Sequence, residues 1–178
     1  MNRRIYPGLL LCLLLFSIHA FGQATATASR LGALQLGVGA TRVYTDYTPQ
    51  KAGGITAYGD LDFRPHWGID GEIHLGSLIT PGHVGEDTYL LGLRYVGHRG
   101  RFDPYLRLMG GIGRLNLNLT NNTGSYTYKV GAFAGGVDIH ITRSINVRAF
   151  DFEAQAWPGY LNGLSPYVVT SGVAYSFH

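Results

Sequence analysis

Hydrophobic and polar residues alternate in short segments along most of the chain, and the clearest segment lies near its C-terminus. From Tyr167 to Phe177, one parity is largely apolar and aromatic, whereas the other carries smaller and more polar residues. Because successive side chains of a strand point to opposite faces, this pattern predicts an amphipathic strand. Its length of about ten residues, with aromatic residues at both ends, suits a tilted strand that crosses a bilayer.

The same period of two recurs in seven earlier segments, so the sequence predicts eight strands. In each of them the apolar parity is assigned to lipid and the polar parity to the interior. The predicted strands cover Ala33–Tyr44, Ile55–Phe63, Trp67–Leu75, Thr88–Tyr95, a fifth from Pro104 to Leu119, a sixth over Ala132–His140, a seventh that starts at Ile145 and ends before a loop at Ala156, and an eighth from Tyr167 to the end.

Two of these segments change parity along their length. In the fifth, the glycine pair Gly110–Gly111 is expected to host a bulge, after which three leucines face lipid. In the seventh, Phe150 falls on the polar parity, so a second bulge is expected near Ala149. The leucines assigned outward in this way are Leu115, Leu117 and Leu119.

The connections between the predicted strands alternate in length. Short turns follow the second, fourth and sixth strands, and long loops follow the first, third, fifth and seventh. Outer-membrane barrels show this asymmetry, with short periplasmic turns and long extracellular loops. An open sheet edge would leave unpaired backbone groups in hydrocarbon, so the sheet must close. The fold class is therefore all-β, an eight-stranded antiparallel up-and-down transmembrane barrel, with both termini in the periplasm.

The N-terminus reads as a secretory signal peptide. Arg3 and Arg4 form a basic start, Leu9 to Phe16 is apolar, and small residues follow. This arrangement is typical of a cleaved leader. We expect a signal peptide over residues 1–24 and one barrel domain over residues 25–178, which lacks cysteine and therefore disulfides.

Composition narrows the function classes further. No stretch after the leader approaches 18 consecutive apolar residues, so a spanning helix is not expected. The net charge of +3 includes leader arginines, and the mature chain has no basic cluster, so no nucleic-acid partner is expected. Histidines and carboxylates are scattered without ligand spacing, and we expect neither a metal site nor a cofactor.

The inward parity carries charged residues of both signs. An eight-stranded barrel has room in its interior only for side chains, and buried charges need partners. We therefore expect an ion-pair network that plugs the lumen, in which Arg94 and Arg107 share acidic partners. Its members are Asp62, Asp70, Glu72, Arg94, Arg107, Asp138 and Arg148. The alternative is a narrow, low-conductance ion channel.

A third possibility is an acyl-transfer enzyme acting on lipid A at the outer rim. A serine, a histidine and a carboxylate suffice chemically for acyl transfer. The residues that invite this hypothesis are Glu72, His74, Ser77, His83, Glu86 and Asp87. None of the local motifs of such enzymes is present, and no catalytic residue is assigned.

Three segments carry a resemblance to a known family. Gly131 to Asp138, Val147 to Phe152 and the closing Gly172 to Phe177 resemble the OmpA-type transmembrane-domain class of small eight-stranded outer-membrane barrels. The resemblance implies a barrel-only, structural, surface-exposed and non-enzymatic protein of the Gram-negative outer membrane, of porin-family type, expected to be a monomer. Its implied partners are outer-membrane lipids, lipopolysaccharide and the barrel-assembly machinery, which reads the sorting strand through Gly172, Tyr175 and Phe177.

Overall fold

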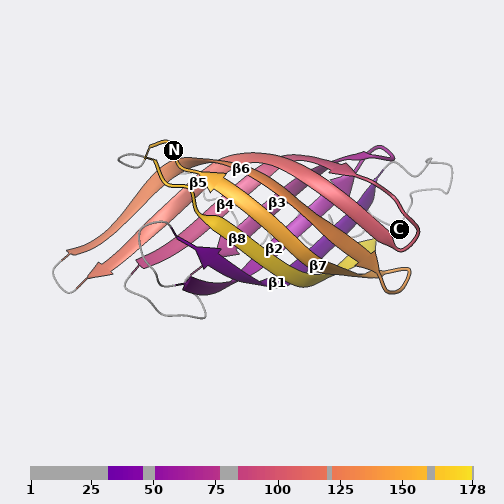
Figure 1. Ribbon diagram of the computed structural model, residues 1–178, viewed down its shortest axis with the longest axis horizontal. Helices are drawn as coiled ribbons and strands as arrows, with labels where there is room; N and C mark the ends of the chain where they lie inside the picture. The colour runs from indigo at the N-terminus through magenta and orange to yellow at the C-terminus, as the bar shows by residue number, and fades with distance from the viewer. Residues whose placement is uncertain (1–31, 46–50, 77–83, 120–121, 160–162, 178) are drawn as a thin grey trace, which may run out of the picture. The chain divides into compact units, whose positions relative to one another are not determined.

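Eight strands close into an antiparallel barrel in the computed structural model, which describes residues 32–45, 51–76, 84–119, 122–159 and 163–177. Each strand pairs with its neighbours in sequence, and the last pairs with the first (Figure 1). Within the described residues no helix has the length and apolar character needed to cross a membrane. The predicted fold class is confirmed, whereas the predicted signal peptide, residues 1–24, lies outside the described residues.

The strands are longer than the sequence pattern indicates, except for the first, the third and the eighth, whose limits agree. They are β1 (Ala33–Tyr44), β2 (Lys51–Asp62), β3 (Trp67–Leu75), β4 (Val84–Val96), β5 (Phe102–Leu119), β6 (Asn122–His140), β7 (Ile145–Ala156) and β8 (Tyr167–Phe177). The β5–β6 hairpin is the longest and projects at the end of the barrel that carries the long loops (Figure 1).

Residues expected in loops take part in the ladders at this end. Gly53 and Gly54 were expected to be part of a loop, but they pair with Arg42 and Thr41 of β1. A side chain on Gly54 would collide with the backbone of Leu75, so this glycine permits a close approach of strands rather than a turn. Polar and glycine residues therefore mark the end of the apolar band, not the end of the strand.

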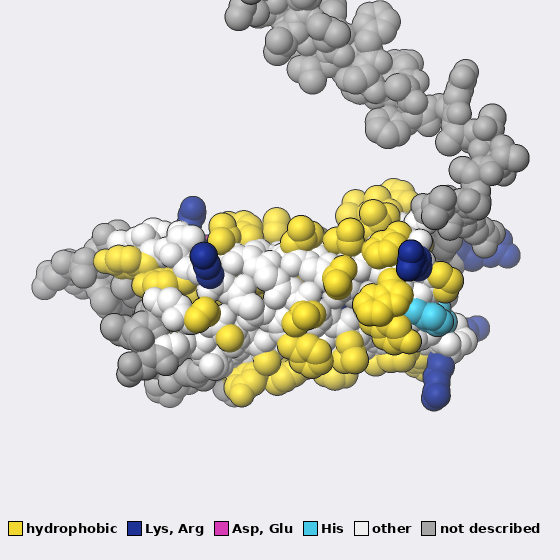
Figure 2. All heavy atoms as spheres, turned by 90° about the horizontal axis from the view of Figure 1, so that it is seen from above, with side chains coloured by type: hydrophobic (Ala, Val, Ile, Leu, Met, Phe, Trp, Pro, Cys, Tyr) yellow, Lys and Arg dark blue, Asp and Glu magenta, His cyan; other side chains and the backbone are white. Residues whose placement is uncertain are grey.

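The inward and outward parities agree with the prediction along most of the barrel. The outer surface is a band of apolar side chains, with basic side chains at its two ends and no acidic side chain on the face in Figure 2. Five aromatic residues on the apolar parity point outward, as that parity predicts, and are 44–52% exposed: Trp67, Tyr95, Tyr167, Tyr175 and Phe177. Aromatic girdles of this kind mark the two interfaces of outer-membrane barrels.

One of the two predicted bulges is present. The register of β7 against β6 and β8 shifts at Ala149, so Ala149 and Phe150 both face outward. The bulge predicted at Gly110–Gly111 is wrong, because β5 pairs without a register shift on both sides. Leu115 therefore faces inward and is 2% exposed, while Leu117 and Leu119 have no described side-chain burial.

The apolar inward residues explain this error. Near the long-loop end the lumen is filled by a hydrophobic cluster rather than by polar side chains, so apolar residues occur on the inner parity there. The cluster contains Leu90, Met109, Val130, Ala132, Ala134, Trp157 and Leu164. Most of the buried charged residues lie in the other half of the lumen, toward the short turns, although Glu86 lies opposite Leu115 near the long-loop end.

Candidate functional site

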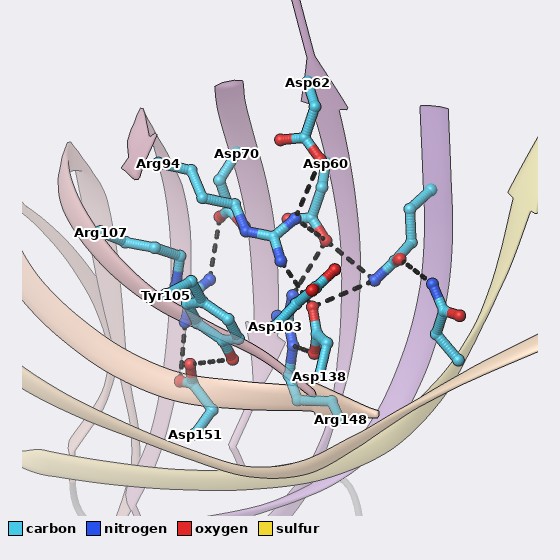
Figure 3. A network of polar contacts seen from close by, with 12 residues as sticks. Asp60, Asp62, Asp70, Arg94, Asp103, Tyr105, Arg107, Asp138, Arg148 and Asp151 are labelled. Carbon is cyan, nitrogen blue, oxygen red and sulfur yellow. Dashed lines mark hydrogen bonds and ion pairs between the residues drawn. The ribbon is translucent and has the colours of Figure 1, made fainter. Parts of the chain in front are cut away.

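Inward-facing charged side chains from six strands meet in the short-turn half of the lumen (Figure 3). They come from β2, β3, β4, β5, β6 and β7, because the inner parity of each strand carries at least one of them. Seven carboxylates surround three guanidinium groups. The carboxylates are Asp60, Asp62, Asp70, Glu72, Asp138, Asp151 and Glu153, and the cations are Arg94, Arg107 and Arg148.

Arg94 and Arg148 share the same two aspartates. Arg94 donates to Asp138 at 2.6 Å and lies 3.1 Å from Asp60. Arg148 donates to Asp60 at 2.9 Å and to Asp138 at 3.1 Å. All four side chains are at most 3% exposed. Asp62 lies at the edge, 3.9 Å from Arg94 and 28% exposed. The contacts of 2.6–3.1 Å among Arg94, Arg148, Asp60 and Asp138 are charge-assisted, and charge-assisted hydrogen bonds are stronger than neutral ones.

Arg107 belongs to a second group of acids. Its guanidinium donates to Asp70 at 2.9 Å, to Glu72 at 2.6 Å and to Asp151 at 2.7 Å. Tyr105 donates its hydroxyl to Asp151 at 2.6 Å. The Tyr105 ring also lies 4.7 Å from the Arg94 guanidinium, 5.5 Å from that of Arg107 and 4.9 Å from that of Arg148. Tyr105 therefore connects the two groups.

The expectation that Arg94 and Arg107 share acidic partners is wrong. The two residues are directly opposite in the β4–β5 register. Like charges on opposite positions repel, and the two side chains diverge toward different carboxylates. Arg148, on the far wall, is the residue that shares aspartates with Arg94.

A double-mutant cycle tests this assignment. Arg94→Ala and Arg148→Ala each leave one arginine to hold both shared aspartates, whereas the double variant leaves neither. Its loss of unfolding free energy is therefore expected to exceed the sum of the single losses by about 0.5–3 kcal/mol. Urea unfolding in detergent measures it. The Arg94→Ala/Arg107→Ala pair is the control, and a coupling as large in that pair would contradict the two-group arrangement.

At the short-turn end, polar contacts continue to the turns through Asp103. Asp103 lies 3.1 Å from Nδ1 of His98 and 2.6 Å from Nε2 of His140. Nε2 of His98 is 2.6 Å from the carbonyl oxygen of Pro65. Burial alone would lower the pKa of His98, but the hydrogen bonds to Asp103 and to Pro65 raise it above its usual value.

All seven residues assigned to the lumen network from the sequence take part in these ion pairs. Asp60, which lies on the inward parity of β2, takes part as well. Three further participants were not recognised. Asp151 and Glu153 face inward only because the bulge at Ala149 shifts the parity of β7. Because that bulge was predicted, the inward orientation of Asp151 and Glu153 could also have been predicted from the sequence. Tyr105 gave no signal beyond its inward parity.

The described residues of the rim hypothesis do not form a cluster that is exposed at the rim. His74 is 1% exposed and faces the lumen together with Glu72. Glu86 is buried, and Asp87 accepts a hydrogen bond from Asn116 at 3.0 Å. Ser77 and His83 lie outside the described residues. The described members of the set therefore include no histidine that a lipid at the rim can reach.

The sorting strand assigned from the sequence is β8, which closes the barrel against β1 and β7. Tyr175 and Phe177 lie on its outer face with their ring centroids 4.9 Å apart. Gly172 is opposite Gly39 of β1, and a side chain on Gly172 would press against the β1 backbone. Gly172 therefore permits close strand contact at the seam.

A closed barrel of eight antiparallel strands, apolar outside and charged inside, defines the class of small transmembrane barrels. The chain belongs to the outer membrane protein beta-barrel domain family, whose model matches residues 8–177. The predicted resemblance to small outer-membrane barrels is confirmed. None of the curated proteins compared matches the chain.

Solved structures share this fold at low sequence identity. The Neisserial surface protein A is 13% identical with a TM-score of 0.57, over 82% of this chain and 97% of its own. The N-terminal barrel of Pseudomonas aeruginosa OprF is 12% identical with a TM-score of 0.60, over 82% and 99%. Yersinia pestis Ail, in complex with the heparin analogue sucrose octasulfate, is 16% identical with a TM-score of 0.54, over 82% and 99%.

Proposed function

We propose that this protein is a structural, surface-exposed outer-membrane barrel without catalytic activity, whose lumen is closed by the ion-pair network. The observation that carries the proposal is the burial of three arginines among seven carboxylates, with Arg107 and Arg148 at most 1% exposed. Buried charges that hydrogen-bond to one another hold the strands in a fixed arrangement, whereas a conducting pore needs hydrated charges.

Conductance in planar bilayers tests this proposal against a narrow ion channel. The parent protein is expected to conduct very little. Arg94→Ala and Arg107→Ala are each expected to raise conductance, because each opens space in the lumen and leaves carboxylates that attract cations. Arg64→Ala, at an exposed turn position, is the control and should change nothing. A high parent conductance that the lumen variants leave unchanged would favour the channel.

The proposed orientation in the membrane rests on loop length. The three short turns are placed in the periplasm and the long loops outside the cell, as in outer-membrane barrels generally. Arg64, Arg99, Arg101 and Arg143 are exposed at the short turns. Protease added to intact cells should then cut the long loops and spare the short turns.

Lipopolysaccharide is the proposed lipid partner at the opposite end. Arg42, Arg114 and Lys129 are exposed on strands near the long-loop end. Arg114 and Lys129 lie on adjacent strands, two residues apart in the β5–β6 register. Paired cations of this kind suit the phosphate groups of lipid A. Lipid A profiles from cells with and without the protein should be identical, since we propose binding and not acyl transfer.

Recognition by the barrel-assembly machinery is proposed to rest on the β8 aromatics. Phe177→Glu is expected to reduce the amount of heat-modifiable, membrane-inserted protein, with the remainder degraded in the periplasm. Phe102→Glu is the control, because Phe102 is 54% exposed at the same end of the barrel and Phe177 is 48% exposed. Equal losses in the two variants would mean that a lipid-facing charge, and not the sorting strand, causes the defect.

We propose that the inserted barrel is a monomer.

A further inference from the structure

Three buried side chains meet halfway along the lumen, between the arginine network and the hydrophobic cluster. They are Glu72 and His74 of β3 and Glu153 of β7, and none is more than 2% exposed. Three strands separate β3 from β7 in either direction around the barrel, so these strands stand on opposite walls. The side chains therefore meet across the full width of the lumen.

His74 is oriented with one ring nitrogen toward both glutamates. Its Nδ1 lies 2.6 Å from the hydroxyl of Thr56, which fixes the ring. Its Nε2 lies 3.6 Å from Glu72 Oε2 and 3.6 Å from Glu153 Oε1, and has no hydrogen-bond partner. Glu72 Oε1 and Glu153 Oε2 are also buried without a hydrogen-bond partner.

The spacing of these atoms fits a shared cation better than direct hydrogen bonds. An N–H···O bond joins atoms about 2.7–3.2 Å apart, which is shorter than the 3.6 Å found here. Ligand atoms about 2.0–2.1 Å from a tetrahedral zinc ion lie about 3.3 Å from one another. The available ligand atoms of the three residues lie within 4.8 Å of one another, so small side-chain rotations would complete such a set.

The charge of the lumen favours a cation at the same place. Arg107 is the nearest cationic group, 2.6 Å from Glu72 Oε2 and 3.9 Å from Glu153 Oε2. The same guanidinium also neutralises Asp70 and Asp151. Arg148 reaches Glu72 only at 3.9 Å. With seven carboxylates around three guanidinium groups, acidic side chains outnumber the arginines in this region.

We propose that Glu72, His74 and Glu153 bind one divalent transition-metal ion that ties β3 to β7 across the lumen. One imidazole and two carboxylates suit zinc and similar ions. Thr56 would hold the His74 ring in place through its hydrogen bond with Nδ1. The proposal rests on the geometry of the lumen and does not depend on the proposed function.

Metal content after refolding tests the proposal. The full mature chain is refolded from urea into detergent with zinc chloride, freed of unbound metal by gel filtration, and analysed by mass spectrometry for zinc. The parent is expected to retain about one zinc per barrel, and zinc should raise its thermal unfolding temperature. A cobalt-loaded sample should show the visible absorption of a low-symmetry site.

The variants His74→Gln and Glu153→Gln should lose the zinc and the zinc-dependent rise in unfolding temperature. The controls His66→Gln and Glu86→Gln remove a histidine and a carboxylate outside the cluster and should retain both. Only material that shows the gel shift of a folded barrel is counted, so a folding failure is not read as loss of metal. A folded parent without stoichiometric zinc, or equal zinc in His74→Gln, would overturn the proposal.

Discussion

Replacing Arg107 by alanine is expected to lower the free energy of unfolding of the barrel by about 3–5 kcal/mol. Arg107 is 1% exposed, and its guanidinium donates to three carboxylates, those of Asp70, Glu72 and Asp151. Without it, these carboxylates remain close together in a poorly hydrated space unless they protonate or water enters. Urea unfolding in detergent, followed by tryptophan fluorescence, measures the loss.

Two further substitutions define the cause of that loss. Arg107→Lys keeps the charge but not the planar fork that reaches several carboxylates, so it is expected to recover only part of the stability. Arg64→Ala removes an exposed arginine at a short turn and is expected to be close to neutral. If Arg107→Ala were as neutral as Arg64→Ala, the lumen would be hydrated without a network, and the channel alternative would gain.

The strand number and the two faces of the barrel could be predicted from the sequence because lipid imposes a strict alternation. Leu91, Leu93 and Leu108 are more than half exposed, as the apolar parity requires. Strand ends were less predictable. Beyond the apolar band a ladder needs only backbone groups, so β4 and β6 continue through residues whose side chains suggest a loop.

Parity proved ambiguous where the inside of the barrel is apolar. Leu115, Trp157 and Met109 are all buried on the inner face. When the lumen is expected to be polar throughout, an inward leucine looks like a shift in register. The bulge at Ala149 was predictable because Phe150 is too apolar for the lumen. The same bulge turns Glu153 inward, but its approach to His74 on the opposite wall depends on the closed barrel and not on spacing along the chain. The sequence therefore gave no indication of the three-residue cluster.

Which arginine pairs with which acid follows from the closed geometry and not from spacing along the chain. Asp60 and Arg148 are 88 residues apart, yet they form a bond of 2.9 Å across the lumen. Parity placed both inside, but the side chain that each one reaches depends on the height of every strand in the barrel. For the same reason Arg94 shares its aspartates with Arg148, on a distant strand, and not with Arg107, which is directly opposite it in the register.

Leu108→Arg is expected to cost about 2–4 kcal/mol of folding free energy in lipid vesicles. Leu108 is 66% exposed on the outer face of β5, between Leu93 of β4 and Phe133 of β6, which are 52% and 56% exposed. It lies six residues along β5 from Phe102, at the short-turn end. With a strand rise of about 3.3 Å and a tilt near 40°, six residues place Leu108 about 15 Å from the aromatic girdle at the short-turn end. This depth is close to the centre of an apolar band about 25 Å tall.

Ile141→Arg is the matched control, because Ile141 is a similarly exposed apolar residue, 59% accessible, but stands at the short turn after β6. An arginine there reaches the interfacial water, so the expected cost is about 0–1 kcal/mol. Both costs come from urea titrations in the same vesicles. If the membrane covers the apolar band between the two aromatic girdles, Leu108→Arg must cost more folding free energy than Ile141→Arg. Equal costs would place Leu108 and Ile141 at the same depth in the membrane, and the band would then not be centred on the middle of the barrel.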